Sequence, residues 1–143
     1  MNKKIKYILI AAIILISILA INHFRNENLG DSSSKEIGIK IIVEDESILD
    51  ESFKTNASTL EELLLELEEN DNIELKYSNS EYGMYIQGMG VDELFEEDAS
   101  QSKYWTYSSE NNKSCLEGGF CPSASALAIE DGDNFVFELS KYE

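Results

Sequence analysis

A single amphipathic helix among strand-like segments is the feature that most constrains the fold of this chain. Leucine recurs at i, i+3, i+4 and i+7, which places one apolar stripe along a helix: Leu60, Leu63, Leu64 and Leu67. We expect Ser58 and Glu61 to form a capping box at its start, and the polar residues 70–72 to end it. A helix this short is not stable by itself, so its leucine stripe must pack against the rest of the domain.

Segments in which apolar and polar residues alternate lie on both sides of this helix, and such alternation is typical of half-buried strands. Residues 37–43 and, more weakly, 47–54 precede it. Further strands are predicted after it at residues 73–77, 82–89, 103–108, 126–129 and 135–139. Two strands, a helix and then several strands predict an α+β domain, with one helix packed on a mixed or antiparallel sheet.

The N-terminus is predicted to be a targeting segment, residues 1–25. Three lysines precede an uncharged apolar run at residues 7–21, so the remainder should be delivered outside the cytoplasm. A run of this length is short for a ~30 Å hydrocarbon core, which favours a cleaved signal peptide. A poor small-residue cleavage site favours retention as a membrane anchor, and both alternatives stay open. Residues 26–36 are predicted to be a flexible stem and residues 37–143 one domain.

The formal net charge of −17 makes nucleic acid and anionic lipid headgroups poor partners for this chain. The densest acidic cluster is Asp92, Glu93, Glu96, Glu97 and Asp98. Calcium binds six to eight oxygens, but the cluster lacks the regular register of a calcium loop. We therefore expect no metal site and a solvated loop, with calcium binding as the open alternative.

Enzymatic activity and a cofactor are not expected. The only histidine, His23, lies beside the apolar run, which leaves the domain without a Ser–His or Cys–His pair. Carboxylates are so abundant that a pair of them has no diagnostic value. No glycine pattern that would cradle a phosphate is present in the sequence.

Cys115 and Cys121 enclose a short loop that contains two glycines. Zinc sites usually bring four closely spaced ligands, so these two cysteines do not indicate one. We expect a disulfide that closes the loop, since the predicted compartment permits it. Two free thiols are the alternative.

Three ordered segments resemble the transcobalamin-like C-terminal domain family: Tyr-Gly-Met-Tyr-Ile-Gln-Gly-Met at 82–89, Tyr-Trp-Thr-Tyr at 104–107, and Ile-Glu-Asp-Gly-Asp at 129–133 running into Phe-Val-Phe at 135–137. The resemblance covers roughly residues 37–139 and implies a small β-grasp-like fold. In animal vitamin B12 carriers this module closes over one face of the bound cobalamin. In bacteria, similar modules occur on exported proteins of undetermined function. The cysteine-bounded loop is a departure, because the family normally has a short turn there.

Strand alternation predicts that Tyr85, Gln87 and Met89 share one face and, with Trp105, form a shallow platform. The resemblance adds Gly88 and implies cobalamin or a related corrinoid as the ligand. The alternative is that Tyr85 and Trp105 belong to the core. Two functions remain open: a non-catalytic ligand-binding module acting with an uptake system, or a surface module for protein interaction without a small ligand.

Overall fold

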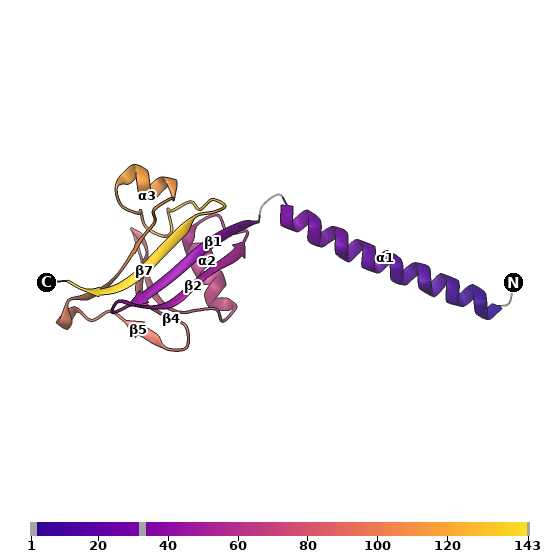
Figure 1. Cartoon of the computed structure of the whole chain (residues 1–143), viewed down its shortest axis with the longest axis horizontal. Coiled ribbons are helices and arrows are strands. Elements are labelled where there is room, and N and C mark those ends of the chain that lie inside the picture. The colour runs from indigo at the N-terminus through magenta and orange to yellow at the C-terminus, as the bar shows by residue number, and fades with distance from the viewer. Residues whose placement is uncertain (1–2, 32–33, 143) are drawn as a thin grey trace. The chain divides into compact units, whose positions relative to one another are not determined.

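The computed structural model describes residues 3–31 and 34–142, which divide into two compact units, residues 1–34 and 35–143. The first contains helix α1 (Lys3–Asp31), which includes the apolar run and residues 26–31 of the predicted stem (Figure 1). Residues 32–33 of that stem lie outside the described residues. Across the described ranges, no helix combines the length and the apolar character needed to cross a membrane. The choice between signal peptide and anchor stays a prediction.

The second unit is a mixed α+β domain made mostly of sheet. Its larger sheet has the strand order β2-β1-β7-β6, formed by β1 (Lys35–Val43), β2 (Glu46–Thr55), β6 (Lys103–Ser108) and β7 (Asn134–Lys141). The central pair β1 and β7 is parallel, and the outer pairs are antiparallel. A smaller antiparallel sheet has the order β3-β4-β5, formed by β3 (Glu74–Ser80), β4 (Gly83–Gly90) and β5 (Leu94–Glu96).

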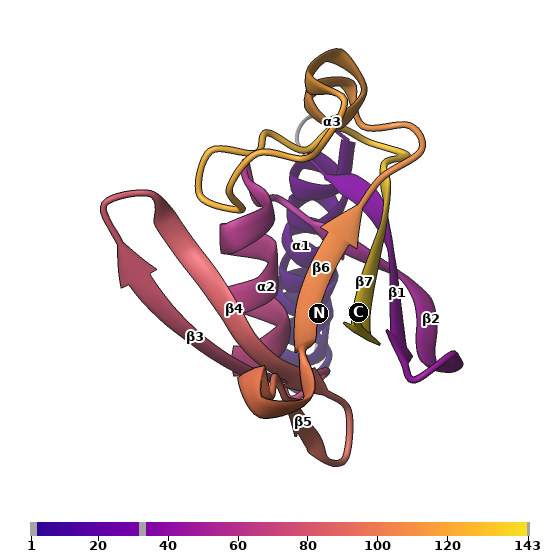
Figure 2. The same ribbon diagram turned by 90° about the vertical axis from the view of Figure 1, so that its left-hand side faces the viewer.

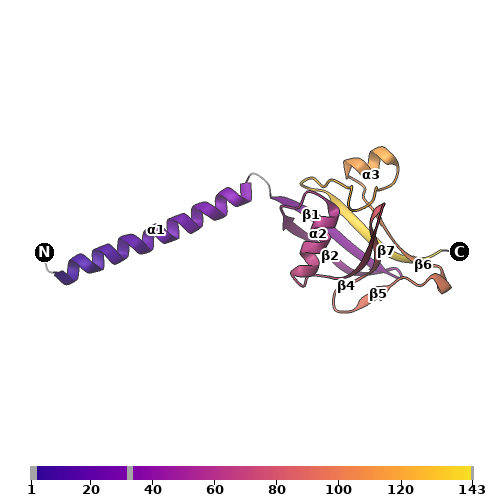
Figure 3. The same ribbon diagram turned by 180° about the vertical axis from the view of Figure 1, so that it is seen from behind.

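Helix α2 (Leu60–Glu69) lies beside both sheets, as Figure 3 shows from behind. All four leucines of its stripe are buried, as predicted. They share the core with the alternate inward residues of β1 and β7, among them Ile37, Ile39, Ile41, Phe135 and Phe137. The remaining helical elements are α3 (Lys113–Gly118) and the 3-10 turn η1 (Ala99–Gln101). The sequence predicted neither of these, nor the short strand β5.

Helix α2 begins one residue later than predicted. Thr59 is the cap, and its hydroxyl accepts a hydrogen bond from the Glu62 amide at 3.3 Å. The Glu62 carboxylate in turn accepts from the Ser58 amide at 2.8 Å. The capping box predicted for Ser58 and Glu61 is therefore wrong by one position. Its cause is tertiary: Thr59 forms a bridge with Ala128, which holds it extended and leaves Leu60 as the first helical residue.

The strand predicted at residues 126–129 is also wrong. This segment forms a turn followed by the isolated bridge from Ala128 to Thr59. It contributes carbonyls to the start of α2 instead, since Leu127 accepts from the Leu60 amide and Ala124 from the Glu61 amide, both at 3.0 Å. These bonds satisfy helix donors that otherwise lack a partner.

The cap position can be tested by paired substitutions. We expect Thr59→Ala to lower the free energy of unfolding by about 1 kcal/mol, because it removes the side-chain acceptor for the helix. Ser58→Ala should change it by less than about 0.5 kcal/mol, since only the Ser58 backbone takes part in the cap. Urea unfolding followed by circular dichroism measures both. A larger loss for Ser58→Ala would restore the original capping box.

Candidate functional site

A β-bulge in β4 decides which side chains reach the surface. Tyr77 lies opposite Ile86 and Lys76 lies opposite Gly88, so Gln87 is an extra residue without a partner on β3. The bulge reverses the side-chain alternation along the strand. Consequently Met89, at 0% exposure, joins Met84 in the core, whereas Tyr85 remains 46% exposed.

The platform predicted from strict alternation is therefore only partly formed. Met89 does not share the exposed face of Tyr85, because the bulge turns it inward. Gly88 is buried, and a Cβ there would lie 3.1 Å from a methyl carbon of Leu94. Gln87 is half-buried, and its carbonyl accepts from the Glu97 amide at 2.9 Å.

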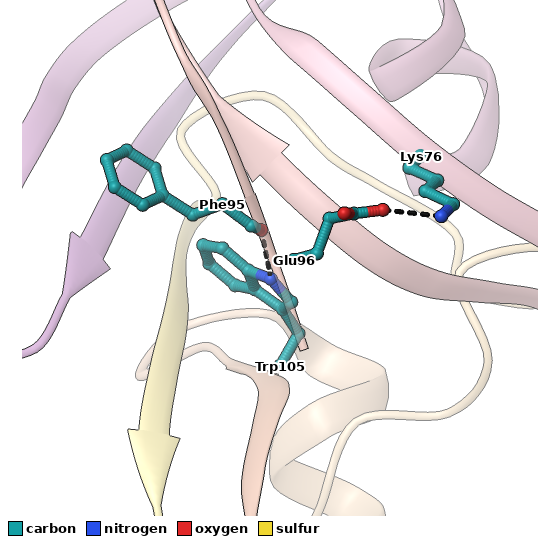
Figure 4. A network of polar contacts seen from close by, with 4 residues as sticks. All are labelled: Lys76, Phe95, Glu96 and Trp105. Carbon is teal, nitrogen blue, oxygen red and sulfur yellow. Dashed lines mark hydrogen bonds and ion pairs between the residues drawn. The ribbon is translucent and has the colours of Figure 1, made fainter. Parts of the chain in front are cut away.

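Trp105 is largely a core residue, with 8% of its surface exposed. Its indole Nε1 donates to the Phe95 carbonyl at 2.9 Å, which links β6 to β5 and so joins the two sheets (Figure 4). Beside this bond Lys76 forms an ion pair with Glu96 across the smaller sheet. Most of the Trp105 side chain therefore belongs to the core, which is the alternative that the sequence left open.

The strands β4 and β6 diverge from each other in Figure 2. Residues of both strands line a groove. This β4–β6 groove has a volume of about 450 Å³. It is lined by Ser78, Ser80, Tyr82, Gly83, Met84, Tyr85, Ile86, Trp105, Tyr107 and Ser123. Two of the predicted site residues, Tyr85 and Trp105, therefore lie on one groove. Strand alternation along β6 puts Tyr107 on the same face as Trp105, whereas nothing in the sequence indicated the serines.

The end wall of the β4–β6 groove is the segment 122–125. The Tyr107 hydroxyl donates to the Pro122 carbonyl at 2.8 Å, and the Met84 amide donates to Ser125 Oγ at 2.9 Å. Gly83 has a φ of +102°, and a Cβ there would lie 2.4 Å from Ser123 Oγ, so only glycine suits this position. That Ser123 hydroxyl is buried and has no hydrogen-bond partner among the described residues.

Tyr85 has a fixed orientation at the mouth of the β4–β6 groove. Its hydroxyl donates to Glu97 Oε2 at 2.6 Å. This hydrogen bond, together with partial burial and the nearby negative charge, raises the pKa of Tyr85 to about 12. Burial also raises the pKa of Tyr107. Both tyrosines consequently present neutral phenols at physiological pH.

Cys115 and Cys121 form the predicted disulfide, which joins α3 to the start of the groove wall. Asn112 caps α3, since its Oδ1 accepts from the Cys115 amide at 3.1 Å. The same side chain is buried and donates to Asp133 Oδ2 at 2.7 Å, close to the start of β7. The disulfide thus connects the groove wall to a helix that is anchored on the larger sheet.

Some of the acidic residues in the segment 92–98 form structural contacts within the domain. Glu96 pairs with Lys76, and Asp98 caps η1 by accepting from the Ser100 amide at 3.0 Å. The hydrogen bond from the Ser100 hydroxyl is the main cause that lowers the pKa of Asp98. Within the ranges that the structure describes, no cluster of three or more potential metal ligands is present.

Comparison with known proteins gives a distant structural relationship and no family assignment. No family model matches the chain, and no curated protein matches it. Haptocorrin in complex with Cbi has a similar fold, with a TM-score of 0.58 and 19% identity over 78% of this chain. The match spans only 26% of the haptocorrin chain. The predicted resemblance to transcobalamin-like proteins is supported at this level of fold.

A second solved structure matches this chain over nearly all of its own length. It is described as a "putative metal binding protein" from Ruminococcus gnavus ATCC 29149. The TM-score is 0.53 and the identity 26%, over 76% of this chain and 99% of that chain. The two matches show that the same fold occurs both as a separate chain and as part of a longer protein.

Tyrosine titration tests the geometry at the groove mouth. We expect Glu97→Gln to lower the pKa of Tyr85 from about 12 toward the usual value of about 10, because the charged acceptor is removed. The raised pKa stabilises the fold below about pH 10, and this contribution is lost as the pH rises toward 12. Absorbance of tyrosinate against pH measures the shift, with Tyr85→Phe identifying the step. Glu93→Gln is the matched control and should leave that step in place.

The disulfide can be tested by mass and by stability. Intact mass under non-reducing, alkylating conditions should show no modified thiol, because Cys115 and Cys121 are joined. With a sequence separation of 6 in the closed loop, the chain-entropy model gives a contribution of about 2.4 kcal/mol. Cys115→Ser should lower the free energy of unfolding by up to that amount while the circular dichroism spectrum stays the same. Two alkylated thiols on protein recovered from its native compartment would contradict the pairing.

Proposed function

We propose that this chain is an extracytoplasmic, non-catalytic ligand-binding module whose site is the β4–β6 groove. The observation that carries the proposal is the groove itself, in which aromatic rings and serine side chains line one cavity. Ligand sites are typically concave and mostly apolar, with a few placed polar groups. The disulfide fits an oxidising compartment, and the strand order with a parallel central pair fits a β-grasp-like domain.

The side chains of the groove favour binding over catalysis. The lining offers phenols, hydroxyls, a thioether and an indole, and it contains no carboxylate, lysine, histidine or thiol. Such groups supply apolar contact and hydrogen bonds, while proton transfer near neutral pH needs groups that titrate there. The raised pKa values of Tyr85 and Tyr107 move both phenols further from that range.

A corrinoid is the first ligand to test. Its flat ring would lie against Tyr82 and Tyr85 at the groove mouth, with a polar substituent near the exposed hydroxyls of Ser78 and Ser80. The groove volume of about 450 Å³ accommodates only part of so large a ligand, so the other face would need a partner such as a transport protein. Binding by the module alone should accordingly be modest.

Fluorescence of Trp105, the only tryptophan, can report on the groove that it lines. We expect cobinamide or cobalamin to quench it saturably with a Kd of tens of micromolar, which corresponds to about 6 kcal/mol. Tyr85→Ala should weaken binding roughly five- to tenfold by removing an aromatic contact. Tyr142→Ala is the matched control, because Tyr142 is a similarly exposed tyrosine outside the groove lining.

Corrinoids absorb where tryptophan emits, so free tryptophan must be titrated in parallel to correct the signal. Calorimetry gives an independent measurement of the same binding. A corrected titration that stays linear to roughly millimolar corrinoid, with equally flat calorimetry, would reject the corrinoid as ligand.

Interaction with another protein is the second candidate function, and one observation favours it. β6 is an edge strand of the larger sheet, and residues 83–86 of β4 lie beyond its pairing with β5, so both strands leave backbone groups unpaired along the groove in the described part of the chain. Unpaired strand edges are suitable sites for pairing with a second polypeptide.

A further inference from the structure

The edge of β4 that faces the β4–β6 groove carries unpaired backbone groups. The Met84 amide donates to Ser125 Oγ, so its backbone points away from β3. In an antiparallel pair every second residue has this orientation, and Ile86 is therefore directed away from β3 as well. Gln87 follows at the bulge, where its carbonyl already accepts from Glu97. The backbone N–H and C=O of Ile86 are therefore both directed toward the groove.

The edge of β6 across the groove has the same property. The Lys103 amide and carbonyl are both bonded to Asp98, which places them on the side away from β7. By the same alternation, Trp105 and Tyr107 direct their backbone groups away from β7 and toward the groove. The Leu139 carbonyl is consistent with this register. Leu139 lies opposite Trp105, but its carbonyl accepts from the Glu44 amide on the other side of β7 and is therefore not directed toward β6.

We propose that the β4–β6 groove binds an extended peptide segment by strand addition, with main-chain hydrogen bonds to Ile86 on one side and to Trp105 and Tyr107 on the other. The inference rests on the proposed function in taking this groove as the binding site, and it adds a class of occupant. Strand addition derives its affinity from main-chain hydrogen bonds and its specificity from pockets for alternate side chains. Here the groove is lined by four aromatic rings and three serine side chains, which offer apolar contact and hydrogen bonds to the side chains of such a segment.

The charge around the groove points to a basic partner segment. Glu97 is fixed at its mouth by the bond from Tyr85, and Glu81 is exposed next to the lining residue Tyr82. No lysine or arginine is among the lining residues, and the whole chain carries a net charge of −17. A segment in which Lys or Arg alternates with Val or Thr would complement both the charge and the strand geometry.

The experiment uses the full chain and the peptide acetyl-Lys-Val-Thr-Val-Lys-amide. We expect saturable binding with a Kd on the order of 100 μM. At saturation, hydrogen exchange of the Ile86 and Tyr107 amides, measured by NMR, should slow by roughly tenfold, since both acquire an acceptor. The Tyr85 and Thr106 amides are the internal controls, because they already pair within their sheets.

Two matched comparisons separate backbone pairing from charge. The same peptide with N-methyl groups on its central residues should lose binding at least tenfold, because it lacks the donors and cannot approach the edges. Glu97→Gln should weaken the unmodified peptide by about threefold at low salt, whereas Glu51→Gln on the outer strand β2 should not. Equal binding of the N-methylated peptide, or unchanged exchange at Ile86, would overturn the inference.

Titration of cobinamide into the same protein tests the proposed small-ligand function separately from this inference. Saturable quenching by cobinamide without any peptide effect would overturn strand addition and leave the small-ligand function standing. Protection of Ile86 by the peptide without a cobinamide signal would support strand addition and reject the corrinoid. If neither probe perturbs the groove, both proposals fail.

Discussion

The parallel pairing of β1 with β7 is the interaction on which the rest of the domain depends. It joins the first strand to the last, aligning Ile39 with Phe135 and Ile41 with Phe137, and these four side chains form the centre of the core. The pairing needs close approach at its start, where a Cβ on Gly38 would lie 2.1 Å from the Asn134 side-chain oxygen. Because β7 is the strand that pairs with β6 in the larger sheet, the position of the β4–β6 groove depends on this contact.

Much of the fold could be predicted from local pattern. The leucine stripe identified α2, and simple alternation identified β1, β6 and β7. In each case one face of the element is buried, so apolar residues recur at the period of a helix or a strand. The errors lie where a distant segment decides local geometry. Thr59 replaced Ser58 as the cap because Ala128 holds it extended, and residues 126–129 supply carbonyls to a helix instead of forming a strand.

The candidate site was less predictable than the fold, for a specific reason. One extra residue at Gln87 shifts every side chain after it to the opposite face, so Met89 enters the core and the predicted platform becomes a groove. A bulge leaves no reliable mark in the amino-acid sequence, and the segment 122–125 that completes the groove has no periodicity. Tyr85 and Trp105 nevertheless both line the β4–β6 groove, although they come from strands of different sheets.

Exposed strand edges commonly cause proteins to aggregate, and the bond from Met84 to Ser125 shows how this chain limits that risk on β4. The loop that holds Ser125 occupies part of the edge and narrows the access to what remains. Together with β5, which pairs with residues 88–90, this loop shortens the stretch of β4 that the edge of another sheet could pair with.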